Sequence, residues 1–206
     1  MNNVDISNCS AQRSGGGIFS GGLIDLTDLR CNDTHANQDG GCLRLQQGGI
    51  VHRSTFARCN TSDRGGGLFV AQGMAEVVET QFHNCDAANG GGAMATLGVA
   101  LLLDEVELTG CRSGKSGGGV LFDSPLGLFY SNDLTLRGNT AALFGGGMVV
   151  RARDIDVDGS TVVQNKARVG GGLALFGLTS IGGAGISDNF AAERGGGLRE
   201  ATIGRL

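Results

Sequence analysis

A glycine triplet recurs at a nearly constant interval along this chain and limits its fold more than any other feature. The triplet lies at 15–17, 65–67, 90–92, 117–119, 145–147, 170–172 and 195–197, with a degenerate copy at 40–42. Successive third positions are 25 to 28 residues apart. A fixed period of this size is typical of repeat architectures, in which each unit stacks on its neighbours.

Two further columns follow the same period. A Cys or Asn stands seven or eight residues before most of the third positions, and Asn32 is assigned to the degenerate repeat. The predicted ladder is Cys9, Asn32, Cys59, Cys85, Cys111, Asn139, Asn165 and Asn189. Three residues before each of these lies an apolar residue, namely Ile6, Leu29, Phe56, Phe82, Leu108, Leu136, Val162 and Ile186. We expect the apolar column to form core and the stacked amides to satisfy buried polar groups.

The residues that follow each triplet alternate in the manner of a strand with one buried face, as in Leu68 and Val70 or Val120 and Phe122. No helical period of 3.6 residues is present. We therefore predict an all-β fold, a right-handed single-stranded parallel β-helix of about eight coils of about 25 residues. Residues 1–206 are expected to form one such domain, as a segment of a longer solenoid.

We assign the glycines a structural role and no catalytic or binding role. The chain has 39 glycines and one proline, and its strict period separates it from flexible low-complexity tracts. We place the triplets at corners between strands, where positive φ values favour glycine. Extra residues in the two longest coils are expected to bulge outward near Ser113–Gly117 or Leu121–Gly127.

The six cysteines all lie within the first 111 residues and admit two interpretations. They form either a buried stack of free thiols interchangeable with Asn, or a disulfide. The disulfide would join Cys31 to Cys42 across one turn, or neighbouring coils, and would indicate an oxidising compartment. Glycosylation sequons at Asn8, Asn32 and Asn60 favour the same compartment. An inward-pointing Asn32 could carry no glycan, which leaves Asn8 and Asn60 as candidate sites.

Composition argues against several classes of partner. The net charge is −4 and the basic residues do not cluster, so no basic face is available for nucleic acid. No apolar run reaches the roughly 18 residues of a membrane span, and the first residues do not resemble a signal peptide. His35, His52 and His83 are isolated from one another and suggest no metal site.

The best candidate for chemistry is the acidic segment that contains Asp154, Asp156 and Asp158. These residues alternate on one face of a predicted strand and could supply oxygen ligands to Ca²⁺. The segment starts like an EF-hand, but Asn165 stands where the bidentate Glu is required. A solvated acidic strand face is the alternative interpretation, and no other cofactor is indicated.

A column of mostly apolar residues two positions after each triplet is expected to point outward. Its apolar members are Phe19, Phe69, Met94, Leu121, Val149 and Ala174, and Arg44 and Arg199 occupy the same column. Stacking at about 4.8 Å per coil would align them into a stripe along the rod. The stripe is interpreted as a face for docking another protein, or as a surface covered by a loop or further segment.

The paired motifs resemble the repeats of chlamydial polymorphic outer-membrane proteins, which also occur in eukaryotic surface proteins. The resemblance is carried by Gly91-Gly92-Ala93-Met94 with its variants, and by Phe56-x-x-Cys59, Phe82-x-x-Cys85, Leu136-x-x-Asn139, Val162-x-x-Asn165 and Ile186-x-x-Asn189. This chain departs from the family by placing Cys for Asn in early coils and aliphatic residues for Phe in later ones. The resemblance implies a right-handed β-helix used in surface adhesion or scaffolding.

Two functions follow as hypotheses. The first is a non-enzymatic structural or adhesive segment of an extracellular or cell-surface assembly, whose partners are other proteins of that assembly or further solenoid coils. The second is a polysaccharide-active enzyme, similar to a pectate lyase or a glycosidase, centred on the three aspartates. The scarcity of aromatic residues, with no Trp and one Tyr, favours the first.

Overall fold

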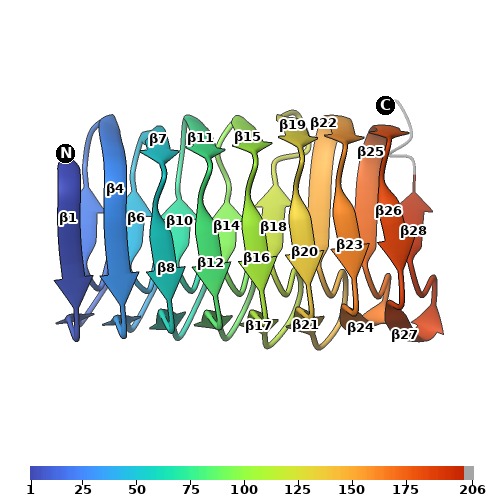
Figure 1. Cartoon of the computed structure of the whole chain (residues 1–206), viewed down its shortest axis with the longest axis horizontal. Helices are drawn as coiled ribbons and strands as arrows, with labels where there is room; N and C mark the ends of the chain where they lie inside the picture. The colour runs from blue at the N-terminus through green and yellow to red at the C-terminus, as the bar shows by residue number, and fades with distance from the viewer. Residues whose placement is uncertain (202–206) are drawn as a thin grey trace.

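The computed structural model of the chain describes residues 1–201 as a parallel β-solenoid of about eight coils (Figure 1). In Figure 1 the near strands run downward, the far strands run upward, and the chain advances from left to right, which makes the coil right-handed. All pairings between named strands are parallel and join successive coils, as in the alignment of Leu68 with Met94 and of Val120 with Met148. The predicted fold class is confirmed.

Each coil contains up to four short strand segments. The first segment follows the glycine triplet, and its strands are β3 (Ile18–Ser20), β6 (Leu43–Leu45), β10 (Leu68–Val70), β14 (Met94–Thr96), β18 (Val120–Asp123), the start of β22 (Met148–Asp158), the start of β25 (Leu173–Gly182) and β28 (Leu198–Ala201). The second comprises β7 (Gly48–His52), β11 (Met74–Val78), β15 (Ala100–Asp104), β19 (Leu128–Asn132) and the later parts of β22 and β25.

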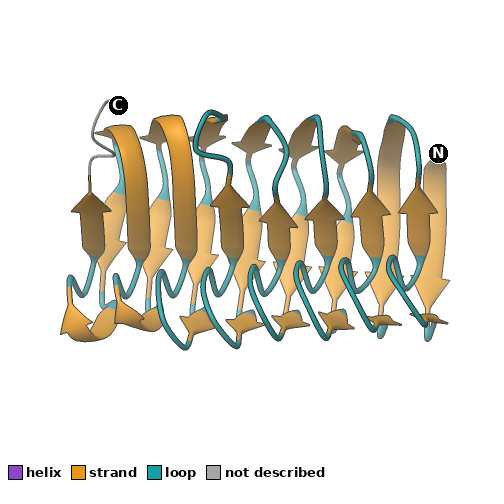
Figure 2. Ribbon diagram, turned by 180° about the vertical axis from the view of Figure 1, so that it is seen from behind, coloured by secondary structure: helices purple, strands orange, loops and turns teal. Residues whose placement is uncertain are grey.

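The third segment continues the near face of Figure 1 and comprises β8 (Thr55–Ala57), β12 (Gln81–His83), β16 (Glu107–Thr109), β20 (Thr135–Arg137), β23 (Thr161–Val163) and β26 (Gly185–Ser187). In the first two coils β1 (Asn2–Ser7) and β4 (Ile24–Asn32) span the second and third segments. A separate eight-stranded sheet along the lower edge holds β2 (Ser10–Ala11), β5 (His35–Ala36), β9 (Asn60–Thr61), β13 (Asp86–Ala87), β17 (Arg112–Ser113), β21 (Thr140–Ala141), β24 (Lys166–Val169) and β27 (Phe190–Arg194). Figure 2 shows the same coils from behind, where loops lead from this lower sheet to the strands after the triplets.

The register of the second coil differs from the prediction. Ile6 aligns with Cys31, and Cys31 aligns with Phe56, so Cys31 and not Leu29 occupies the apolar column. Asn32 aligns with Ser7 and Ala57 and lies outside the ladder. The buried Thr34 takes its place, since its carbonyl accepts the Asn60 N–H as the Cys9 carbonyl accepts that of His35. The Cys-or-Asn rule fails there because a hydroxyl also fits the column.

The fourth coil is also shifted by one residue relative to the prediction. Gly91 aligns with Gly65 and has its positive φ, and Ala93 corresponds to Gly67. Met94 therefore points into the main core, where it is fully buried, and Ala95 aligns with Phe69 in the outward column. Four consecutive small residues, Gly90 to Ala93, hide the register in the sequence.

The three glycines of one triplet have three different physical roles. Gly65 has φ +68°, a conformation that L-residues rarely adopt. A Cβ on Gly66 would collide with the Gly92 carbonyl oxygen of the next coil, because the two backbones touch there. A Cβ on Gly67 would lie 2.9 Å from Cδ1 of the Phe82 ring. Only the third role depends on a neighbouring side chain, and that position alone holds Cys42 and Ala93 in other coils.

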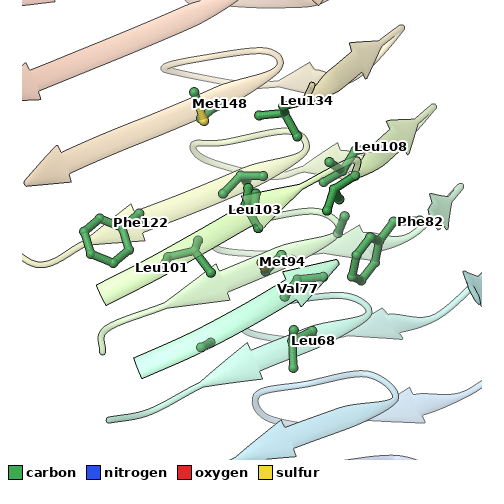
Figure 3. Close-up of a cluster of buried hydrophobic side chains, with 14 of the residues drawn as sticks. Leu68, Val77, Phe82, Met94, Leu101, Leu103, Leu108, Phe122, Leu134 and Met148 are labelled. Atoms are coloured by element: carbon green, nitrogen blue, oxygen red, sulfur yellow. The ribbon is translucent and has the colours of Figure 1, made fainter. Parts of the chain in front are cut away.

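The main core fills the interior of the solenoid with stacked columns of apolar side chains (Figure 3). The rings of Phe56 and Phe82, in successive coils, lie 4.6 Å apart and almost parallel. Leu108 and Leu136 continue the same column, and both are fully buried. No helix long and apolar enough to cross a bilayer is found within residues 1–201.

Candidate functional site

The ladder column is a continuous hydrogen-bonded spine in the later coils. Oδ1 of Asn139 accepts the Cys111 N–H at 2.9 Å, and its Nδ2 donates to the Leu108 carbonyl at 2.8 Å. Asn165 repeats the pattern with the Asn139 N–H and the Leu136 carbonyl. Each amide thus satisfies two buried backbone groups of the preceding coil, whose loss would be costly.

The cysteines of the early coils take part of the same role. Sγ of Cys111 lies 3.7 Å from the Phe82 carbonyl, and Sγ of Cys85 lies 3.7 Å from the Phe56 carbonyl. The thiol therefore donates where Asn would use Nδ2, although it is a weaker donor. This shared contact explains why Cys in the early coils and Asn in the later coils can occupy the same column. Cys59, Cys85 and Cys111 are buried free thiols, whereas Cys9 is exposed.

Both interpretations of the cysteines hold in different places. Cys31 and Cys42 form a disulfide across one turn of the second coil, with Cα atoms 6.4 Å apart. Cys31 lies in the column of Phe56 and Cys42 in that of the third glycine. The bridge therefore fills the space that a large apolar residue facing a glycine fills in other coils.

The predicted docking stripe is continuous but covered by the chain itself. Phe69, Ala95, Leu121, Val149 and Ala174 form a second apolar cluster outside the main core, and each is at most 9% exposed. Phe19 alone of the predicted members is exposed, at 56%. The interpretation of these residues as a free docking face is wrong, and the alternative of a covering segment is correct.

The cover is the loop that leads from the lower sheet to each triplet. Bridges join Arg64, Gly90, Ser116, Phe144 and Val169 of successive coils into a short parallel ladder beside the stripe. The Arg64 guanidinium lies 4.9 Å from the centre of the Phe69 ring, and Phe144 packs on the cluster. A Cβ on Gly90 would collide with Leu121. The sequence allowed for a covering loop but did not identify which segment covers the stripe, because this loop is not periodic in residue type.

Asp154, Asp156 and Asp158 stand at alternate positions of β22 on its outward side. Leu128, Tyr130 and Asn132 face them from one coil and Leu178, Ser180 and Gly182 from the other, so no paired position in a neighbouring coil carries a carboxylate. Asp154 pairs with Arg153 at 2.8 Å, and Asp158 accepts the Gly159 N–H at 3.0 Å. Same-face residues of a strand are about 6.6 Å apart, too far for one cation to be held by all three carboxylates without bending the strand.

An acidic hollow on the near face of Figure 1 escaped sequence reasoning. Its carboxylates are Glu79, Glu105, Glu107 and Asp133, and its volume is about 340 Å³. Glu79 lies 3.4 Å from His52, whereas no ion pair involves Glu105 or Asp133 within residues 1–201. These acidic residues come from successive coils and share no local motif, so only the coil register brings them together.

Exposed apolar side chains belong to the turns that lead into the second strand segment, and these turns form the upper edge of the molecule in Figure 1. We call Leu23, Met74, Leu97, Val99, Leu126 and Leu178 the apolar turn edge, and their exposed fractions run from 38% to 85%. The turn between β18 and β19 lies in this region and is two residues longer than the equivalent turn of the preceding coil, because Met94 pairs with Val120 and Ala100 with Leu128. It is one of the two predicted bulges. The sequons at Asn8 and Asn60 also place their side chains at the surface.

Comparison with protein-family models, with curated proteins and with solved structures found no match to this chain. The likeness to the chlamydial repeats therefore rests on the short glycine and Phe-x-x-Asn motifs. The fold itself stands independently of that likeness.

Proposed function

We propose that this chain is a non-enzymatic structural solenoid of an extracellular or cell-surface assembly, and that it binds other proteins of the assembly along its apolar turn edge. The observation that carries the proposal is the exposure of Leu126 at 85%, Leu23 at 77% and Val99 at 64% along one edge of a rigid rod. Scattered apolar residues are normal on a surface, but several exposed apolar residues at the turns of one edge favour a contact face.

The edge is suited to binding because it is held by the sheet beneath it. Met74 begins β11, and the same strand buries Ala75 and Val77 in the main core. Leu23, Ile24, Ile50 and Met74 also line a hollow of about 450 Å³. A partner side chain can enter this hollow without ordering a mobile loop, which lowers the entropic cost of association.

Three features favour an oxidising, extracellular setting. The disulfide joins Cys31 to Cys42, the sequons at Asn8 and Asn60 are at the surface, and the repeats resemble those of surface adhesins. Together these features support the proposed compartment.

The test compares the Val99→Ser/Leu126→Ser double variant with Phe190→Ser, whose side chain is exposed on the lower sheet away from the edge. Binding to the cell-surface fraction of the source cells and sedimentation over a concentration series would both be measured. We expect the double variant to lose association at least tenfold and the control to keep it. Equal association of all three proteins would contradict the proposal.

One observation favours the alternative function of a polysaccharide-active enzyme. In this alternative the active site is the acidic hollow and not the segment with Asp154, Asp156 and Asp158. Glycosidases use a pair of carboxyl groups, and Glu79, Glu105, Glu107 and Asp133 supply several in one depression. The negative charge of these carboxylates would repel an acidic polysaccharide, so the substrate of this alternative would be a neutral glycan. Release of reducing ends by the wild-type chain, lost in Glu105→Gln, would establish this alternative.

A further inference from the structure

A cluster of three sulfur atoms in the main core has no role in the proposed docking. Sγ of Cys31, Cys42 and Cys59 all lie within 4.8 Å of one another, and all three residues are fully buried. Within residues 1–201 this is the only group of three His, Cys, Asp or Glu side chains so close together. Cys31 and Cys42 are joined as a disulfide, and Cys59 is a free thiol beside them.

A fourth polar group adjoins the sulfurs. The Oγ1 atom of Thr34, which is fully buried, lies 3.6 Å from Sγ of Cys31. Buried polar groups are normally engaged, and this hydroxyl is directed at the sulfurs.

We propose that, when the Cys31–Cys42 bridge is reduced, Cys31, Cys42 and Cys59 bind one Zn²⁺ ion as thiolates with the Thr34 hydroxyl as fourth ligand. Zinc prefers four ligands at tetrahedral positions, with Zn–S distances of about 2.3 Å. Such bonds place ligand sulfurs about 3.8 Å apart. Reduction must therefore first separate the bonded Sγ atoms of Cys31 and Cys42 to this distance, whereas Sγ of Cys59 already lies within 4.8 Å of both.

Charge favours a divalent over a monovalent soft ion in this apolar core. Three thiolates leave one net negative charge around Zn²⁺ but two around Cu⁺, and burying unpaired charge is costly. The Thr34 hydroxyl adds a ligand without adding charge. Zn²⁺ is therefore the ion that the cluster fits best.

Reduction and reoxidation of the Cys31–Cys42 bridge convert the protein between a disulfide state and a zinc-bound state. A dithiol reductant transfers two electrons and two protons to the Cys31–Cys42 bond, which yields two thiols and a cyclic disulfide of the reductant. Binding of Zn²⁺ then releases the protons of the three thiols. Reoxidation of Cys31 and Cys42 by a disulfide removes two ligands and expels the ion.

The proton release sets the direction of the pH dependence. Because protons compete with the metal at each sulfur, the affinity for Zn²⁺ should fall as the pH is lowered.

The test uses asparagine substitutions, because Asn occupies the column of Cys59 in later coils and fits there. Cys59→Asn removes one ligand of the cluster, and Cys111→Asn is the matched control in the same column outside it. Each protein is reduced with a phosphine and freed of reductant without oxygen. It is then given Zn²⁺ alone, both after folding and during refolding. Bound metal after gel filtration and the thermal unfolding midpoint are measured.

We expect the reduced wild type and Cys111→Asn to retain one Zn²⁺ per chain and to melt at a higher temperature with the metal. Cys59→Asn should bind at least tenfold more weakly, Thr34→Val about tenfold more weakly, and the unreduced wild type should retain no ion. If the reduced chain is unfolded without metal, recovery of its β-sheet circular dichroism on adding Zn²⁺ serves as the readout. Equal retention by Cys59→Asn or by the unreduced protein, or tighter binding of Cu⁺ than of Zn²⁺, would overturn the proposal.

Discussion

At the scale of single residues, the glycine triplet is three separate requirements in a row. The first glycine provides a backbone conformation, the second allows two coils to touch, and the third leaves room for a core side chain, as Gly65, Gly66 and Gly67 show. The three residues are identical in sequence, but the structural requirements for glycine at the three positions differ in strength. The third is the least strict, because its nearest neighbour is a side chain, whereas a Cβ on either of the first two glycines would meet backbone atoms, which cannot move aside.

This difference predicts unequal effects of adding one methyl group. In Gly66→Ala the new Cβ meets the Gly92 carbonyl and lies 2.6 Å from the Asp86 carbonyl oxygen, so we expect a loss of at least about 3 kcal/mol. In Gly67→Ala the methyl meets the edge of the Phe82 ring, which can shift, and the loss should be about 1 kcal/mol. Urea unfolding would measure both, and a smaller loss in Gly66→Ala would contradict the assigned roles.

At the scale of elements, the outward side of the strands after the triplets is an internal surface. It packs under the loop ladder from Arg64 to Val169 and forms a second core parallel to the main one. Arg44 lies in this column between the rings of Phe19 and Phe69, at 5.6 Å from each ring centre. The solenoid is thus stabilised by two apolar layers, one inside the coil and one beneath its loops.

Removal of one side chain from the second layer should destabilise the fold. Phe69→Ser replaces a side chain that is 2% exposed, and large-to-small changes of this kind cost about 3 kcal/mol or more. Met74→Ser on the apolar turn edge, where the side chain is 52% exposed, should change stability by no more than about 0.5 kcal/mol. Thermal unfolding of the two variants checks this, and a stable Phe69→Ser protein would show that the layer is dispensable.

At the scale of the whole molecule, the solenoid is a one-dimensional stack in which each coil contacts its neighbours. Parallel pairing of every named strand pair within residues 1–201 makes equivalent positions interchangeable, as Gly65 and Gly91 are. Stability is then close to a sum over coils and the interfaces between them.

Deletion of residues 65–90 should therefore remove one coil and leave the others intact. The deletion joins Arg64 to Gly91, which follows Gly90, the bridge partner of Arg64. We expect a folded protein with β-sheet circular dichroism, a lower unfolding midpoint, and a urea m-value smaller by about an eighth, because less surface is exposed on unfolding. An unfolded product would show that the coils are not equivalent.

The sequence by itself determined the class of fold and most of the interior. The period of the triplets required a stack of coils, and the column from Phe56 through Phe82 to Leu108 had to face inward because a strand alternates its sides. The repeat also indicated the ladder residue in seven of the eight coils, all except the second. These properties are local or periodic, so the sequence of each coil carries the same pattern.

Only the tertiary structure decided the register of the coils where the repeat is degenerate. It also decided which side chains of neighbouring coils are in contact. It placed Thr34 instead of Asn32 in the ladder, turned Met94 inward, and covered Phe69 and Leu121 with loops of non-periodic composition. It also gathered Cys31, Cys42 and Cys59 from two coils into one cluster. The physical reason is that hydrogen bonds between coils pair each residue with one specific residue of the next coil. A run of small residues such as Gly90 to Ala93 is compatible with two registers that differ by one position, so its sequence alone does not define the pairing.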